Sequence, residues 1–123
     1  MSQNEHVVVL GASPKPERFA NKAIKSLTRH GHCVTPVHPK LAEIESLKVA
    51  NSLGEINTTI DTLTLYVGPA RLEGMIEDII AAQPGRVIFN PGTESDTLQN
   101  ALDAYNIPWQ EDCTLVLLNN QQF

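Results

Sequence analysis

The sequence is poor in cysteine, with only Cys33 and Cys113 among its 123 residues. They lie far apart, and neither belongs to a Cys-x-x-Cys pair or to a His/Cys cluster with the spacing of metal ligands. This argues against a zinc site and a disulfide-held fold, and favours a reducing compartment. No apolar run approaches the roughly 18 residues of a membrane span, and the N-terminus lacks the cationic segment of a signal peptide. We therefore expect a cytoplasmic protein with no membrane partner.

Glycine and proline occur at about their ordinary frequencies, with 7 and 8 residues. With 41% hydrophobic and 19% charged residues, the composition excludes disordered, collagen-like and low-complexity chains. A chain of this length has the size of one ordinary domain and does not accommodate separate cofactor and substrate domains. We expect residues 1–123 to form a single domain.

The net charge of −5 is unevenly distributed. Residues 1–40 carry six basic and two acidic side chains, whereas residues 41–123 carry three basic and twelve acidic ones. The acidic remainder would repel an extended polyanion such as nucleic acid, so a small phosphorylated ligand fits the basic part better. A solvated basic helix face explains the same charges without a ligand.

The apolar pattern alternates between the periods of strands and helices. Short β-branched runs predict buried parallel strands, and apolar residues three and four apart predict helices between them. The expected strands are 6–10, 33–37, 61–67, 86–89 and 107–109, and the expected helices are 19–30, 70–82 and one that residues 93–96 open with a capping-box pattern. Residues 114–118 fit either a strand or the start of a helix, and residues 48–56 are best read as a short edge strand and a one-turn helix.

This alternation indicates an α/β fold, namely a Rossmann-like three-layer structure with a parallel sheet of about five strands and helices on both faces. In such folds a ligand binds outside the carboxyl ends of the strands, near the point where the strand order switches. The residues that follow each strand are therefore the candidates for a site.

The loop after the first strand runs from Gly11 to Arg18 (GASPKPER) where a dinucleotide fold would have its glycine motif. The second and third glycines are missing, which makes this a different kind of turn. Ser13 offers a hydroxyl donor, and Lys15 and Arg18 bring positive charge to the start of the next helix, so the loop suits a phosphate. An ordinary turn capped by Ser13, with both cations solvated, fits equally.

The loop after the second strand contains His38, Pro39 and Lys40. A fold that binds NAD places an acidic residue near this position for the ribose hydroxyl, and none occurs between Glu17 and Glu43. Histidine and lysine here favour a phosphorylated ribose, as in NADP or coenzyme A. A neutral loop histidine and a solvated lysine are the alternative.

Two further loops complete the expected crevice. The residues in them that we expect beside a ligand are Tyr66, Val67, Gly68, Pro69, Asn90, Pro91, Gly92 and Thr93. The glycines permit close approach of a ligand to the backbone, and both loops precede helix N-termini, whose free N–H groups bind anions. Core packing by the tyrosine, and a tight turn with a helix cap in the second loop, explain the same residues without a ligand.

No catalytic set is visible. Nothing in the sequence brings Ser13, His38 and Asp61 together, and Cys113 follows two acidic residues that would disfavour a thiolate. We expect no catalytic residue and no metal site.

The strings GASPKPER, PVHPK, YVGP, NPGTE and the closing CTLVLL together resemble the small single-domain CoA-binding proteins, which are related to the CoA-binding domain of the succinyl-CoA synthetase α subunit. The resemblance covers about residues 5–118. It implies a Rossmann-like fold that binds coenzyme A. Two departures are His38, where related sequences often have Asn, and residues 19–21 (FAN), which replace a commoner small-polar stretch.

The resemblance also implies roles for single residues. By position, Gly11, Ala12, Ser13 and Arg18 would hold the phosphates and Lys40 would face the phosphoadenosine, while residues 66–69 and 90–93 would border the ligand. The ATP-grasp partner and the domain with the phosphorylated histidine of the synthetase are missing, so ligase activity is not expected. We expect non-catalytic binding of coenzyme A or an acyl-CoA, with a partner protein or a homodimer left open. The alternatives are an NADP-binding oxidoreductase-like domain and a ligand-free scaffold that pairs through residues 119–123.

Overall fold

The computed structural model describes residues 4–123, and its centre is a five-stranded parallel sheet with the strand order β2-β1-β5-β6-β7. The strands are β1 (His6–Leu10), β2 (Cys33–Val37), β5 (Thr62–Leu65), β6 (Arg86–Phe89) and β7 (Trp109–Glu111). The predicted α/β architecture is confirmed.

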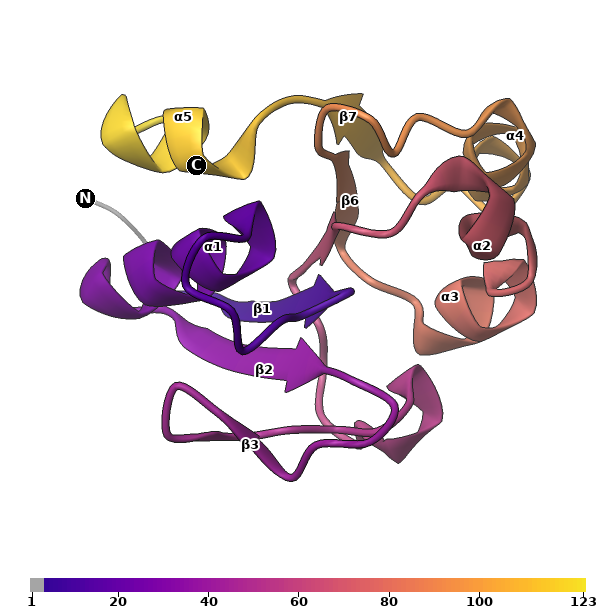
Figure 1. Ribbon diagram of the computed structural model, residues 1–123. Coiled ribbons are helices and arrows are strands. Elements are labelled where there is room, and N and C mark those ends of the chain that lie inside the picture. Colours follow the sequence, from indigo (N-terminus) through magenta and orange to yellow (C-terminus); the bar gives the residue numbers. More distant parts are fainter. Residues whose placement is uncertain (1–3) are drawn as a thin grey trace.

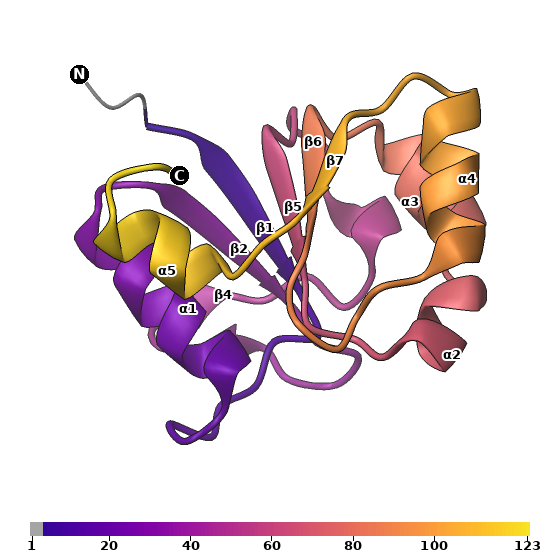
Figure 2. The same ribbon diagram turned by 90° about the horizontal axis from the view of Figure 1, so that it is seen from above.

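Helices cover both faces of this sheet, which makes the fold three-layered (Figures 1 and 2). One face carries α1 (Phe19–Arg29) and α5 (Thr114–Asn119), and the other carries α2 (Pro69–Glu73), α3 (Ile76–Ala82) and α4 (Asp96–Ala104). Alternation along β1 explains why both faces are apolar: Val7 and Val9 pack with the α1 side, and Val8 and Leu10 with the other.

Residues 43–55 form a small substructure at the β2 edge of the sheet. It consists of an antiparallel hairpin of β3 (Glu43–Ile44) and β4 (Leu47–Lys48), followed by the 3-10 helix η1 (Leu53–Glu55). The expected one-turn helix is present as η1, but the expected edge strand is replaced by β4, which pairs with β3 in a separate two-stranded sheet that the sequence pattern did not predict.

Several predicted boundaries were wrong. The predicted helix 70–82 is divided into α2 and α3 because α2 ends at Glu73 and Met75, with φ −113° and ψ 1°, leaves helical geometry before α3 begins. The helix predicted to open at 93–96 begins later, since Ser95, rather than Thr93, accepts the capping hydrogen bond from the Leu98 N–H. The last strand lies at 109–111 instead of 107–109, and the strand predicted at 61–67 is shortened to Thr62–Leu65. For residues 114–118, where a strand and a helix start were both open, the structure has the helix α5.

The strand order reverses between β1 and β5, since the chain moves outward from β1 to β2 and then returns to the other side of β1. The loops after β1 and β5 therefore diverge and leave a crevice between them. Within residues 4–123, no helix is long and apolar enough to cross a membrane.

Candidate functional site

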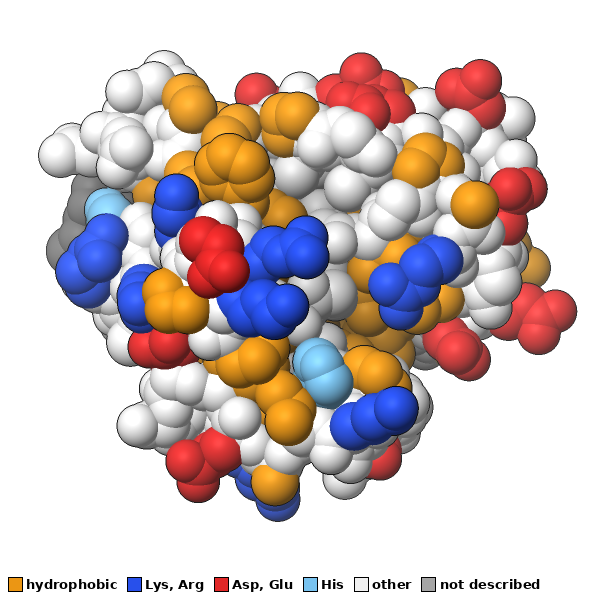
Figure 3. Space-filling view, viewed as in Figure 1, with side chains coloured by type: hydrophobic (Ala, Val, Ile, Leu, Met, Phe, Trp, Pro, Cys, Tyr) orange, Lys and Arg blue, Asp and Glu red, His pale blue; other side chains and the backbone are white. Residues whose placement is uncertain are grey.

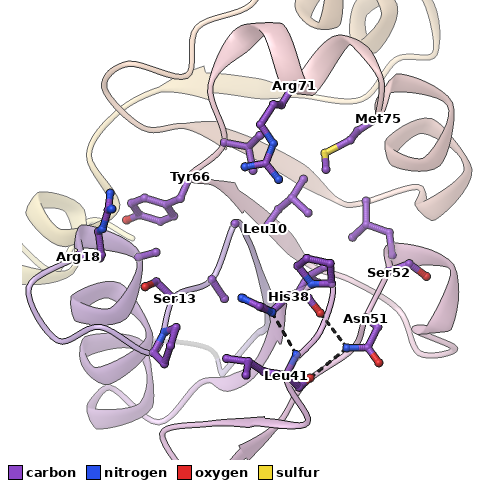
Figure 4. A pocket seen from close by; sticks show the side chains of 18 of the residues that line it. Leu10, Ser13, Arg18, His38, Leu41, Asn51, Ser52, Tyr66, Arg71 and Met75 are labelled. Atoms are coloured by element: carbon purple, nitrogen blue, oxygen red, sulfur yellow. Dashed lines mark hydrogen bonds between the residues drawn. The ribbon is translucent and has the colours of Figure 1, made fainter.

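A cavity of about 860 Å³ opens at this crevice, beyond the carboxyl ends of β1, β2 and β5 (Figure 4). Of the residues predicted for the site, those that line it are Gly11, Ala12, Ser13, Lys15, Arg18, His38, Pro39, Tyr66 and Val67. The chain segments that follow three strands thus meet at one place.

The loop after β1 forms the first wall. Gly11 has φ +89°, and a Cβ atom there would lie 2.7 Å from the Tyr66 carbonyl oxygen, so only glycine lets this loop pass so close to β5. The Ser13 hydroxyl accepts a hydrogen bond from the Lys15 N–H at 3.1 Å, which shapes the turn. Arg18 precedes α1 in extended conformation and leaves its guanidinium exposed at the cavity.

His38 lies on the second wall as a neutral hydrogen-bond donor. Its Nδ1 accepts from the N–H groups of Lys40 and Leu41, each at 3.1 Å, so the ring proton resides on Nε2. Figure 4 shows this Nε2 pointing toward the side of the cavity where Ser13 lies. Asn51 fixes the wall from behind, because its amide donates to the carbonyl oxygens of His38 and Leu41 at 2.8 and 3.0 Å.

Tyr66 closes the cavity next to the first loop. Burial raises the pKa of its hydroxyl to about 12, and the nearby hydroxyls of Thr114 and Thr64 oppose that rise in part. No group among the described residues makes a hydrogen bond of good geometry with this buried hydroxyl. Tyr66 therefore stays neutral at physiological pH and does not repel an anionic ligand.

A third wall was missed by the sequence analysis. Arg71 on α2 and Met75 line the side opposite Arg18 (Figure 4), and Asp78 also belongs to the cavity lining. Arg71 stands two residues after Pro69, in the first turn of a helix that begins beyond a strand, and this position could have suggested it. Residues 51–53 also line the cavity, and no motif in the sequence marks them.

Lys40 and several other predicted site residues lie outside the cavity lining. Lys40 is exposed in the loop after β2, where its described hydrogen bond is that of its backbone N–H with His38. Gly68 and Pro69 begin α2 and are exposed. The binding roles of these residues stay predictions.

The Asn90 side chain lies in the interior and makes its hydrogen bonds with other parts of the fold. Its amide nitrogen donates to Thr64 Oγ1 and to the Leu65 carbonyl oxygen, each at 2.7 Å, and its Oδ1 accepts from the Thr114 N–H at 2.9 Å. Pro91, Gly92 and Thr93 follow in a turn that also lies outside the cavity lining. This turn holds itself together, since Thr93 Oγ1 donates to the Asn90 carbonyl oxygen and the Gly92 N–H donates to Glu94.

The charges around the cavity favour an anion. Lys15, Arg18 and Arg71 approach it from two sides, against the single acid Asp78. Figure 3 shows Lys and Arg side chains around a hollow whose floor is hydrophobic, while acidic side chains gather toward the α2–α4 side of the molecule. The ion pairs among residues 4–123 are Lys25–Glu45 and Arg86–Glu5, so the three cavity cations are not engaged in them.

The arrangement does not form a hydrolytic triad. Ser13 and His38 lie at the carboxyl ends of the strands, whereas Asp61 precedes β5 at the amino end and accepts from the His6 N–H at 2.8 Å. Within residues 4–123, no cluster of three or more His, Cys, Asp or Glu has a geometry that could hold a metal ion.

The family model described as CoA binding domain matches residues 5–119, which is nearly the whole chain. The chain belongs to this family. A crystal structure of an uncharacterised protein aligns with a TM-score of 0.88 and 34% identity, covering 99% of this chain and all of that one. The structure named cell-free ID.343 from Thermus thermophilus aligns with a TM-score of 0.89 and 26% identity, covering 98% of this chain and 91% of that one.

A curated relative is YneT of Bacillus subtilis (strain 168), which is described as uncharacterised. It is 26% identical over 80 residues, and the match spans 65% of this chain and 59% of YneT. The suspected resemblance to small CoA-binding domain proteins is confirmed.

Proposed function

We propose that this protein binds coenzyme A or an acyl-CoA without transforming it, and serves as a carrier, sensor or regulatory subunit. The observation that carries the proposal is the cavity at the β1/β5 switch point, where Lys15, Arg18 and Arg71 surround an apolar floor. Membership of the CoA binding domain family supports the same ligand.

The composition of the cavity fits the chemistry of coenzyme A, which joins a nucleotide with three phosphate groups to a long, largely uncharged arm. Leu10, Val37, Leu41, Leu53 and Met75 supply apolar surface for a base or the arm. The cavity volume of about 860 Å³ falls in the range of about 300–1,000 Å³ that small-molecule sites occupy.

The polar groups divide into charged and neutral donors. Arg18 and Arg71 offer planar guanidinium groups suited to bidentate contacts with phosphate, and Lys15 adds a point charge. His38 Nε2–H supplies a neutral donor beside them. Tyr66 contributes an aromatic ring to the lining, while its hydroxyl is buried beside the Thr114 and Thr64 hydroxyls.

Isothermal titration calorimetry tests the proposal with coenzyme A, 3′-dephospho-CoA, NADP and ATP as ligands. We expect coenzyme A to bind at least about tenfold more tightly than 3′-dephospho-CoA, because a charged phosphate contact contributes about 1.5–3 kcal/mol. Tighter binding of NADP than of coenzyme A, or the absence of binding heat with coenzyme A, would contradict the proposal.

Two arginine variants make the test specific to the cavity. Arg18→Ala should weaken binding of coenzyme A by about 10- to 100-fold, since it removes one charged phosphate contact. Arg29→Ala removes the same charge from the last turn of α1, outside the cavity lining, and should change the affinity by less than about twofold. Equal losses in both variants would indicate a general charge effect.

A further inference from the structure

The turn of the β3–β4 hairpin has a strained backbone. Glu45 and Ser46 have φ values of 52° and 64°, in the left-handed region that glycine and asparagine prefer in such turns. The two flanking strands have only two residues each, so their pairing does little to hold the turn. Strained residues persist where neighbouring structure holds them, so the turn depends on what Glu45 contacts.

Asn21 of α1 makes that contact. Its side chain is completely buried, and its amide nitrogen donates to Glu45 Oε2 at 3.1 Å and to the Ser13 carbonyl oxygen at 2.9 Å. These two acceptors fix the orientation of the amide, because a flipped oxygen would face two oxygens. Lys25 Nζ lies 3.9 Å from the same Glu45 oxygen and holds the carboxylate from the next turn of the helix.

These hydrogen bonds connect two walls of the cavity. Ser13 belongs to the 11–18 loop of the first wall. The hairpin is tied to the second wall, since the His38 N–H donates to the Ala50 carbonyl oxygen and the Val49 N–H donates to the Ala42 carbonyl oxygen. Figure 4 shows Ser13 on one side of the cavity and His38 on the adjoining side.

We propose that Asn21 and Glu45 are positioning residues that hold the 11–18 loop and the 43–48 hairpin at the separation that binding of coenzyme A requires. The inference rests on the function proposed above. Neither residue lines the cavity, so both act through the walls they join. A positioning role and a purely electrostatic role predict opposite changes in affinity when Glu45 is removed. Removing an acid near an anion site should strengthen binding if charge alone matters, whereas loss of positioning weakens it.

Calorimetric titration with coenzyme A tests this in Glu45→Ala, Glu45→Gln and the control Glu43→Ala. Glu43 is an exposed acid on the same hairpin, so its removal changes the charge equally and leaves the contact with α1 intact. We expect Glu45→Ala to weaken binding by about five- to tenfold, the equivalent of one hydrogen bond. Glu45→Gln should bind like the wild type because its amide oxygen still accepts from Asn21. Glu43→Ala should stay within about twofold of the wild type.

Cleavage by trypsin without ligand provides the second readout. Lys15 precedes Pro16, a bond that resists trypsin, so Arg18–Phe19 is the cleavable bond at the end of the loop. Glu45→Ala should be cut there several-fold faster than Glu43→Ala, with mass spectrometry identifying the site. The proposal requires both effects, and unchanged or tighter binding by Glu45→Ala, or equal cleavage rates, overturns it. A wild-type protein that binds no coenzyme A would instead refute the proposed function, while the cleavage comparison would still decide whether Glu45 holds the loop.

Discussion

At Gly11 the backbone determines which residue can stand at the start of the first loop. With φ at +89°, a Cβ atom would lie 2.7 Å from both the Tyr66 carbonyl oxygen and Val67 Cγ2. Gly11→Ala therefore combines a left-handed alanine, which costs about 1–2 kcal/mol, with a clash against backbone, and should lower the free energy of unfolding by about 2–3 kcal/mol. Urea unfolding followed by Trp109 fluorescence measures the loss.

Gly54→Ala is the matched control for this substitution. Gly54 lies in η1 with an ordinary backbone, and a methyl group there would have Ser52 Oγ as its nearest neighbour at 3.8 Å, an ordinary contact. Alanine at this position should leave the stability unchanged or raise it by up to about 1 kcal/mol. A Gly11→Ala protein as stable as Gly54→Ala would show that the first loop adapts without strain.

Tyr66 should make the stability of the fold fall at alkaline pH. Burial raises the pKa of its hydroxyl to about 12 in the folded protein, against about 10 in an unfolded chain. Between these values the unfolded chain has lost a proton that the folded protein keeps, so stability falls as the pH rises. The stabilisation is complete below about pH 10 and is lost as the pH rises through about 12. At pH 11 the loss of stability amounts to about 1 kcal/mol.

The two tyrosines of the chain allow a direct comparison. Tyr66→Phe removes the buried hydroxyl, whereas Tyr105→Phe removes one from a side chain that is 65% exposed. Urea unfolding at pH 8 and pH 11 should show a stability loss that is about 1 kcal/mol smaller in Tyr66→Phe than in Tyr105→Phe. Identical losses would mean that the Tyr66 hydroxyl titrates as it does in water.

At the scale of elements, α5 is attached to the sheet through Asn90. The Asn90 side chain joins Thr64 and Leu65 of β5 to the Thr114 N–H at the start of α5, and all of these groups are buried. Asn90→Ala leaves two or more buried polar groups without partners and should lower the free energy of unfolding by about 2–4 kcal/mol. Hydrogen exchange should also show lost protection at the Thr114 amide.

Asn119→Ala is the control, because Asn119 is exposed in the last turn of α5. This change should alter stability by less than about 0.5 kcal/mol. If Asn90→Ala keeps full stability and Thr114 protection but loses affinity for coenzyme A, Asn90 is a ligand contact, as the sequence pattern predicts, and the attachment of α5 lies elsewhere.

Individual elements differed in how well the sequence predicted them. The strands 6–10, 33–37 and 86–89 were predicted with their observed bounds, because each is a buried apolar run bounded by turn residues. The division of 70–82 could not be seen, since the apolar spacing continues through the break at Gly74. The 43–48 hairpin was not predicted because its turn has Glu45 and Ser46 in place of the Asn-Gly or Asp-Gly pair typical of such turns, and a distant helix contacts it instead.

At the scale of the whole molecule, the architecture followed from alternation of strands and helices, because right-handed crossovers allow few other arrangements. The same logic located the cavity, since parallel strands end at one edge of the sheet. It could not show which distant side chains return to that edge. Arg71 and Asp78 reach the cavity only because α2 and α3 fold back over it. Asn90 points inward, where its Oδ1 accepts a hydrogen bond from the Thr114 N–H at the start of α5.

The charge distribution of the molecule predicts that binding of coenzyme A depends on salt. Lys15, Arg18 and Arg71 are exposed at the cavity, so salt screens them as the Debye length falls from about 10 Å at 0.1 M to about 3 Å at 1 M. At 0.1 M NaCl, coenzyme A at 100 times its Kd should add about 2.7 kcal/mol of stability and raise the Tm by several degrees.

At 1 M NaCl and the same ligand concentration, the affinity should fall about tenfold, which removes about 1.4 kcal/mol of that stabilisation. Thermal unfolding with and without coenzyme A at each salt concentration separates this loss from the effect of salt on the free protein. Arg71→Ala should show a smaller salt dependence than the wild type, because one screened charge is already gone, whereas Arg29→Ala should retain the full dependence. If the ligand-induced Tm shift is the same at both salt concentrations, apolar contacts with the cavity floor, and not the three cations, dominate the binding.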